Sequence, residues 1–113
     1  MKVAVIGSRS LRIDNLSQYL PGNTTEIISG GARGIDSSAR LYARKHGIPY
    51  REYAPDYEKY GRSAPLRRNI TIIEQAELVL AFWDGQSSGT AYVIRKCREM
   101  GVPCRVFMKI DKT

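Results

Sequence analysis

The strongest constraint in this 113-residue sequence is the alternation of short apolar runs with helical patterns. Two runs mix polar with apolar residues, which predicts strands at the edges of a sheet: YREY (50–53) and CRVFM (104–108). Three runs are continuously apolar and rich in branched residues, which is typical of strands buried on both faces. These three runs are VAVI (3–6), EII (26–28) and ELVLAF (77–82).

Apolar residues at helical spacing lie between these runs. Ile13, Leu16 and Leu20 predict a short first helix that ends at Pro21-Gly22. Three further helices are predicted with their own boundary signals. They cover 35–46 with Gly47 at the end, 66–73 with Pro65 at the start, and a stretch that SSGT (87–90) opens, with apolar residues over 93–100 and Gly101 at the end.

Strict alternation of strands and helices predicts a parallel sheet with helices on both faces. Placing the two mixed strands at the edges gives the strand order 3-2-1-4-5 with about four helices. We therefore expect a three-layer, doubly wound, Rossmann-like α/β fold, formed by a single domain over residues 1–113. Ligands of such sheets bind at the carboxyl ends of the strands, near the point where the strand order reverses.

The composition narrows the choice of partners. The net charge of +7 indicates an anionic partner, or alternatively a basic surface that only faces water. Two cysteines without a CxxC motif and a single histidine argue against a metal site, and no cofactor is expected. The apolar stretch at the N-terminus is too short for a signal sequence or a membrane span, so we expect a cytoplasmic protein with no membrane partner.

Three small, glycine-rich loops follow strands that should lie side by side. They are Gly7-Ser8-Arg9-Ser10, the segment 29–34 within ISGGARGID, and the segment 83–90. Glycines at a helix start let a phosphate approach the unpaired backbone N–H groups. Arg33 would add a charge-assisted hydrogen bond. Asp36, in the first turn of the next helix, is interpreted as a complement to the helix dipole.

The spacing GGxxG matches neither the dinucleotide fingerprint nor the P-loop, which disfavours an NAD site and a kinase or GTPase. The segment 54–69 carries Tyr57 and Tyr60, which would either stack on a base or pack the loop down. Arg67, Arg68 and Asn69 begin the following helix beside the expected site.

Taken together, VAVIGSRS, IISGGARGID, PDYEKYGRSAPLRRN and AFWDGQSSGT resemble the SLOG superfamily of Rossmann-like nucleotide-binding domains. The resemblance extends over residues 2–107 and is closest to the small stand-alone YspA/YpsA-related proteins. It implies a pocket for a nucleotide or a nucleotide derivative, as a sensor or processing domain. The matching positions, with Asp84 added from its place after the fourth strand, are Gly7, Ser8, Arg9, Gly30, Gly31, Arg33, Gly34, Arg68, Asn69, Asp84, Ser88, Gly89 and Thr90.

Two other functions stay open at this point. One is a hydrolase that cleaves an N-glycosidic or phosphate linkage, with Asp84 as acid or base and Arg68 stabilising negative charge. LOG enzymes of the superfamily carry a glutamate where this chain has Val93. The other is a module that binds single-stranded nucleic acid in the manner of DprA. SLOG relatives often pair through helices, which also leaves a homodimer open.

Overall fold

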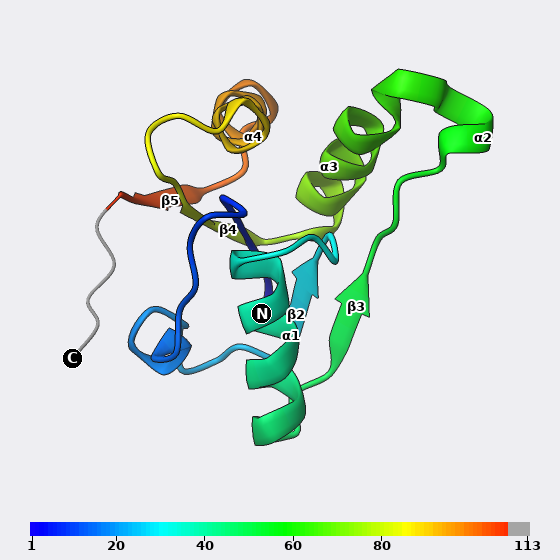
Figure 1. Ribbon diagram of the computed structural model, residues 1–113. Coiled ribbons are helices and arrows are strands. Elements are labelled where there is room, and N and C mark those ends of the chain that lie inside the picture. The colour runs from blue at the N-terminus through cyan, green and yellow to red at the C-terminus, as the bar shows by residue number, and fades with distance from the viewer. Residues whose placement is uncertain (109–113) are drawn as a thin grey trace.

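A computed structural model describes residues 1–108 and contains one five-stranded parallel sheet (Figure 1). The strand order is β3-β2-β1-β4-β5, and every pair of neighbours is parallel. This confirms the predicted order, with the three apolar strands inside and the two mixed strands at the edges. The strands are β1 (Lys2–Gly7), β2 (Glu26–Ser29), β3 (Tyr50–Glu52), β4 (Leu78–Phe82) and β5 (Cys104–Phe107).

Helices cover both faces of the sheet and complete three layers. Helix α1 (Ile35–His46) packs on β1 and β2, whereas α3 (Ala64–Gln75) and α4 (Ser88–Met100) lie together on the opposite face (Figure 1). Because successive side chains of a strand point to opposite faces, β1 feeds both cores. Val3 and Val5 pack on the α1 side, and Ala4 and Ile6 pack on the side of α3 and α4.

The sequence signals at the helix ends have the expected geometry. Gly47 ends α1 and Gly101 ends α4, each with the left-handed backbone that glycine adopts without strain. Pro65 lies in the first turn of α3, where its missing N–H costs no hydrogen bond. The three helices α1, α3 and α4 therefore begin and end close to their predicted bounds.

The segment between β1 and β2 differs from the prediction. Only one 3-10 turn forms, η1 (Leu16–Gln18), in place of the expected helix. Ile13 and Leu16 are buried as their spacing predicts, but the Ile13 backbone N–H donates to the Ser38 hydroxyl at 3.1 Å. That bond holds the segment against α1. The stretch before Pro21 is also short, so few helical hydrogen bonds could offset the free-energy cost of nucleating a helix there.

Residues 54–63, predicted as part of an irregular segment, contain an unexpected short helix. Helix α2 (Tyr57–Tyr60) is followed by the 3-10 turn η2 (Gly61–Ser63), and both precede α3. The Asp56 carboxylate caps α2 by accepting a hydrogen bond from the Lys59 backbone N–H at 3.1 Å. This arrangement brings the tyrosines of the segment alongside the first half of α3.

Gly34 is the glycine that most constrains the fold. It has φ of 73°, and a Cβ at this position would lie 2.6 Å from the carbonyl oxygens of Ser8, Arg9 and Leu11. Gly47 has a similar φ of 66° but no atom within 4 Å of its would-be Cβ. The loop after β1 can therefore pack on the start of α1 only because residue 34 lacks a side chain.

We expect Gly34→Ala to lower the free energy of unfolding by about 3 kcal/mol, because backbone strain and overlap with backbone atoms add together. Gly47→Ala introduces backbone strain but no overlap with other atoms, so it should lower the free energy of unfolding by about 1 kcal/mol. Urea unfolding followed by circular dichroism measures both. Equal losses for the two variants would contradict this account of Gly34.

Candidate functional site

A cleft of about 540 Å³ opens at the carboxyl ends of β1 and β4. The sheet order reverses between these strands, which is where ligands of doubly wound sheets bind. The cleft is enclosed by the loop after β1, the first part of α3 and the start of α4. Its volume falls within the range of small-molecule sites.

Nine of the predicted site residues line this cleft, and four do not. Those that line it are Gly7, Ser8, Arg9, Arg68, Asn69, Asp84, Ser88, Gly89 and Thr90. The lining also includes Asp36 and Val93, together with the apolar residues Ile6, Pro65 and Leu66. The four outside it are Gly30, Gly31, Arg33 and Gly34, all from the loop after β2.

The start of α4 presents unpaired backbone N–H groups to the cleft. Ser87 precedes the helix in the capping position, but its side chain does not cap it. Its hydroxyl instead contacts the Ser8 hydroxyl at 2.9 Å and the Asp84 carboxylate at 2.9 and 3.0 Å. The first-turn N–H groups of α4 therefore stay available to a ligand, together with the partial positive charge of the helix end.

Asp84 holds the loop before α4 in place. Its carboxylate accepts hydrogen bonds from the backbone N–H groups of Ser87 (2.8 Å) and Gln86 (2.9 Å), and from the Ser10 hydroxyl (2.9 Å). The bonds from Ser87 and Gln86 in particular lower the pKa of Asp84 below its usual range. A carboxylate held ionised in this way joins two loops of the cleft and is poorly suited to carry a proton in a reaction.

Asp36 differs from Asp84 in that it is buried and its pKa is raised. Its side chain lines the cleft but is only 5% exposed, and its Oδ2 accepts from the Ala32 backbone N–H at 3.2 Å. Burial raises the pKa of this carboxyl, even though the Ala32 hydrogen bond and the charge of Arg68 act in the other direction. The sequence favours a helix-dipole role for Asp36, although Asp36 and Asp84 are the two carboxylates expected near the site; the structure places Asp36 in the cleft lining.

Arg68 is fixed by hydrogen bonds to two strand ends. Its Nη1 donates to the carbonyl oxygens of Gly30 (2.6 Å) and Tyr53 (3.2 Å), and its Nε donates to Asn69 Oδ1 (2.9 Å). A Cβ on Gly30 would lie 2.7 Å from Arg68 Nη1. Gly30 therefore makes room for the arginine that crosses from α3 to the ends of β2 and β3.

Within the loop after β2, Ala32 lines the cleft, whereas Gly31, Arg33 and Gly34 lie outside the lining. Gly31 has φ of 74°, and a Cβ there would lie 2.5 Å from the carboxyl carbon of Glu52. Arg33 is exposed and lies outside the lining. The phosphate contact predicted for this loop finds no support in its geometry, because its glycines are occupied in packing against Arg68, Glu52 and the loop after β1.

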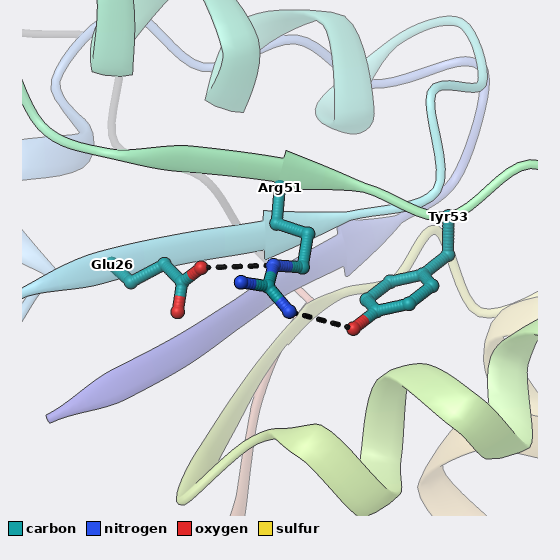
Figure 2. Close-up of polar contacts among 3 residues, drawn as sticks. All are labelled: Glu26, Arg51 and Tyr53. Atoms are coloured by element: carbon teal, nitrogen blue, oxygen red, sulfur yellow. Dashed lines mark hydrogen bonds and ion pairs between the residues drawn. The ribbon is translucent and has the colours of Figure 1, made fainter.

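An ion pair ties the edge strand β3 to its neighbour. Arg51 Nε lies 3.1 Å from Glu26 Oε1, and Arg51 Nη1 donates to the Tyr53 hydroxyl at 3.5 Å (Figure 2). The contact with Tyr53 and the charge of Glu26 raise the pKa of Arg51. The backbone of Tyr53, whose carbonyl group accepts from Arg68, is held to the end of β2 by the hydrogen bond from its N–H to the Ser29 carbonyl oxygen at 3.0 Å.

Two further observations concern residues 1–108 as a whole. Within this range, no group of three or more histidine, cysteine, aspartate or glutamate side chains is arranged to hold a metal ion. Nor does any helix of the same range combine the length and the apolar character needed to cross a bilayer.

The parallel sheet, the three layers and the cleft at the strand reversal define a Rossmann-like α/β domain. The sequence model of the YspA, cpYpsA-related SLOG family (YAcAr) matches residues 1–60, and the chain belongs to this family. The match confirms the resemblance seen in the sequence motifs. It includes the loops after β1 and β2, but it ends before α3 and α4.

The chain is also similar to the Gene 61 protein of Mycobacterium phage D29. The two are 34% identical over 83 residues, which cover 68% of this chain and 66% of the phage protein, slightly under two thirds of its length. No solved structure matches the chain.

The two cleft carboxylates should titrate on opposite sides of the ordinary aspartate pKa of 3.8. We expect Asp36 above it, because the group is buried, and Asp84 below it, because backbone N–H groups favour its charged form. Carboxyl ¹³C NMR, assigned with Asp36→Asn and Asp84→Asn, measures both values. The reverse order would contradict this description of the cleft.

The low pKa of Asp84 has a consequence for stability. Because folding lowers this pKa, the ionised carboxylate stabilises the folded state above about pH 4, and that contribution is lost as the pH falls towards the folded pKa. Asp84→Asn should therefore be less stable than the wild type at pH 7. The difference in unfolding free energy should shrink below about pH 4.

Proposed function

We propose that this protein binds a nucleotide or a nucleotide-derived phosphate ligand in the cleft, with a phosphate on the first turn of α4. The observation that carries this proposal is the uncapped helix start, where Ser88, Gly89 and Thr90 line the cleft while the Ser87 hydroxyl is engaged elsewhere. Phosphate is the kind of group that such a helix end stabilises, through its N–H groups and its dipole.

Two arginines support an anionic ligand. Arg9 lines the cleft, is exposed, and forms no ion pair with any residue of the described range 1–108. Arg68 is already oriented by the carbonyl groups of Gly30 and Tyr53, so less conformational freedom is lost when it meets a ligand. A charge-assisted hydrogen bond from an arginine of this kind contributes about 1.5–3 kcal/mol.

Family membership and composition agree with this proposal. The family makes a nucleotide-related function the natural expectation, and the net charge of +7 favours anionic partners. We further propose a cytoplasmic location, which suits the two free cysteines Cys97 and Cys104.

The substitution Gly89→Ala should weaken ligand binding without lowering the stability of the fold. Gly89 lies in the first turn of α4, and a Cβ there meets no atom within 4 Å. We expect Gly89→Ala to leave the unfolding free energy unchanged or higher, because alanine favours helix. The new methyl group should nevertheless weaken binding of nucleoside phosphates about tenfold in titration calorimetry, by keeping a phosphate from the backbone.

The matched control is Gly22→Ala, which also adds a Cβ in open space but in the segment between β1 and β2. It should leave affinity unchanged. Arg9→Ala and Arg33→Ala form a second pair, in which only Arg9 lines the cleft. Binding that is weakened by Arg33→Ala and not by Arg9→Ala or Gly89→Ala would move the ligand to the loop after β2 and overturn the proposal.

A second candidate function, hydrolysis of an N-glycosidic bond, is favoured by Asp36 alone. Val93 lines the cleft and is apolar, so it cannot serve as the acid or base. Asp36 is a buried carboxyl beside Arg68 with a pKa that burial raises, and perturbed carboxyls of this kind are candidates for general acids or bases. In such a reaction the bond between the sugar carbon and the base nitrogen breaks while the oxygen of water bonds to that carbon. The departing base takes a proton from Asp36, and the proton released by the water returns to Asp36.

Release of free base from nucleoside monophosphates, followed by chromatography, tests this second candidate. We expect Asp36→Asn to reduce turnover at least about 100-fold, in line with the loss of a general acid or base. Asp84→Asn should keep most of the turnover, provided that binding is intact. If the wild-type protein releases no base, this hydrolase candidate is wrong and only the binding function remains.

A further inference from the structure

A second pocket of about 290 Å³ lies on the other side of α3. It is formed by Tyr60 at the end of α2, by one face of α3 from Ala64 to Glu74, and by the segment that follows β3. Arg68 lines both this pocket and the cleft. Hydrogen bonds to the carbonyl groups of Gly30 and Tyr53 fix the guanidinium group of Arg68, which therefore forms part of the wall of both cavities.

The wall of this α2–α3 pocket offers flat, cation-bearing surfaces. Two cations lie over the Tyr60 ring: the Arg67 guanidinium carbon is 5.3 Å and Lys59 Nζ is 5.2 Å from its centre, and of these three residues Tyr60 and Arg67 line the pocket. Tyr53 lines it as well, and Figure 2 shows its side chain anchored by Arg51. Planar π-systems stack on aromatic rings and on guanidinium groups of this kind.

The remaining polar groups of the pocket include two carboxylates, which make it better suited to an uncharged group than to a phosphate. Asp56 and Glu74 contribute carboxylates, which repel an anion. Within residues 1–108, the Glu74 carboxylate has no hydrogen bond or ion pair, so it is available to accept from the amino group of a base or from a sugar hydroxyl. The Thr71 hydroxyl donates to the Arg67 carbonyl at 3.3 Å and can still accept a hydrogen bond.

We propose that the α2–α3 pocket binds the uncharged base portion of a nucleoside, stacked on the wall of Tyr60 and Arg67 with Glu74 accepting from its amino group. This site is distinct from the phosphate site of the cleft and goes beyond the function proposed above. It also gives a role to Tyr60, for which the sequence left stacking and loop packing equally open. The base arrives either as a free nucleoside or as one end of a dinucleotide.

Adenosine, added to protein saturated with inorganic phosphate, probes this pocket directly. We expect Tyr60→Leu to weaken adenosine binding about tenfold in titration calorimetry, as the loss of one stacking surface does. The affinity for inorganic phosphate should stay unchanged. Tyr57→Leu is the matched control, because Tyr57 lies in the same short helix, is more exposed and does not line the pocket.

Amide chemical-shift changes on adding adenosine should centre on residues 60, 71 and 74. Diadenosine diphosphate distinguishes the two sources of the base. If the base belongs to a dinucleotide, both Tyr60→Leu and Gly89→Ala weaken that ligand. If the base comes as a free nucleoside, Gly89→Ala leaves the affinity for diadenosine diphosphate unchanged, whereas Tyr60→Leu weakens that affinity.

Three results would overturn the inference: no adenosine binding in the millimolar range, equal affinities for Tyr60→Leu and the wild type, or shift changes confined to the cleft. Failure of inorganic phosphate to bind has a different meaning. That result counts against the phosphate site on α4, whereas adenosine binding that depends on Tyr60 still supports the pocket.

Discussion

The hydrogen bonds of the Arg68 side chain link one helix to the ends of two strands. One guanidinium group joins α3 to the carbonyl groups that follow β2 and β3, and it separates the cleft from the α2–α3 pocket. Its position depends on Gly30, which leaves the required space, and on the carbonyl group of Tyr53, a residue bound to β2 through its backbone N–H. The local geometry of two cavities therefore rests on an arginine in the first half of a helix.

Much of the fold could be predicted because the pattern of apolar residues along the sequence indicates which strands are buried. Continuous apolar runs such as 3–6 and 78–82 must be buried on both faces, so they occupy the centre of the sheet, and the mixed strands fall at its edges. The segment between β1 and β2 shows the limit of this reasoning. Ile13 and Leu16 are buried as predicted, but burial does not require a helix when a hydrogen bond from the Ile13 N–H to the Ser38 hydroxyl already holds the chain.

The site was less predictable than the fold, because spacing in the sequence does not reveal which way a residue faces. The order of the strands was enough to bring the loops after β1 and β4 to one cleft. It could not show that the glycines after β2 are used for packing, since a close approach to a phosphate and a close approach to Arg68 both demand glycine. Nor could it distinguish Asp36 from Asp84, whose pKa values shift in opposite directions because of contacts that form only in the folded chain.

The choice between these two carboxylates follows from how each is solvated. Asp84 lies where backbone N–H groups converge, so the protein itself supplies the hydrogen bonds that water would give and keeps the group charged. Asp36 has lost most of its contact with water and receives only part of that compensation. A phosphate arriving at α4 would add negative charge to a cleft that already holds both groups. Of the two, Asp36 is the one that can relieve this repulsion by taking up a proton, so anion binding at this site should be coupled to its protonation.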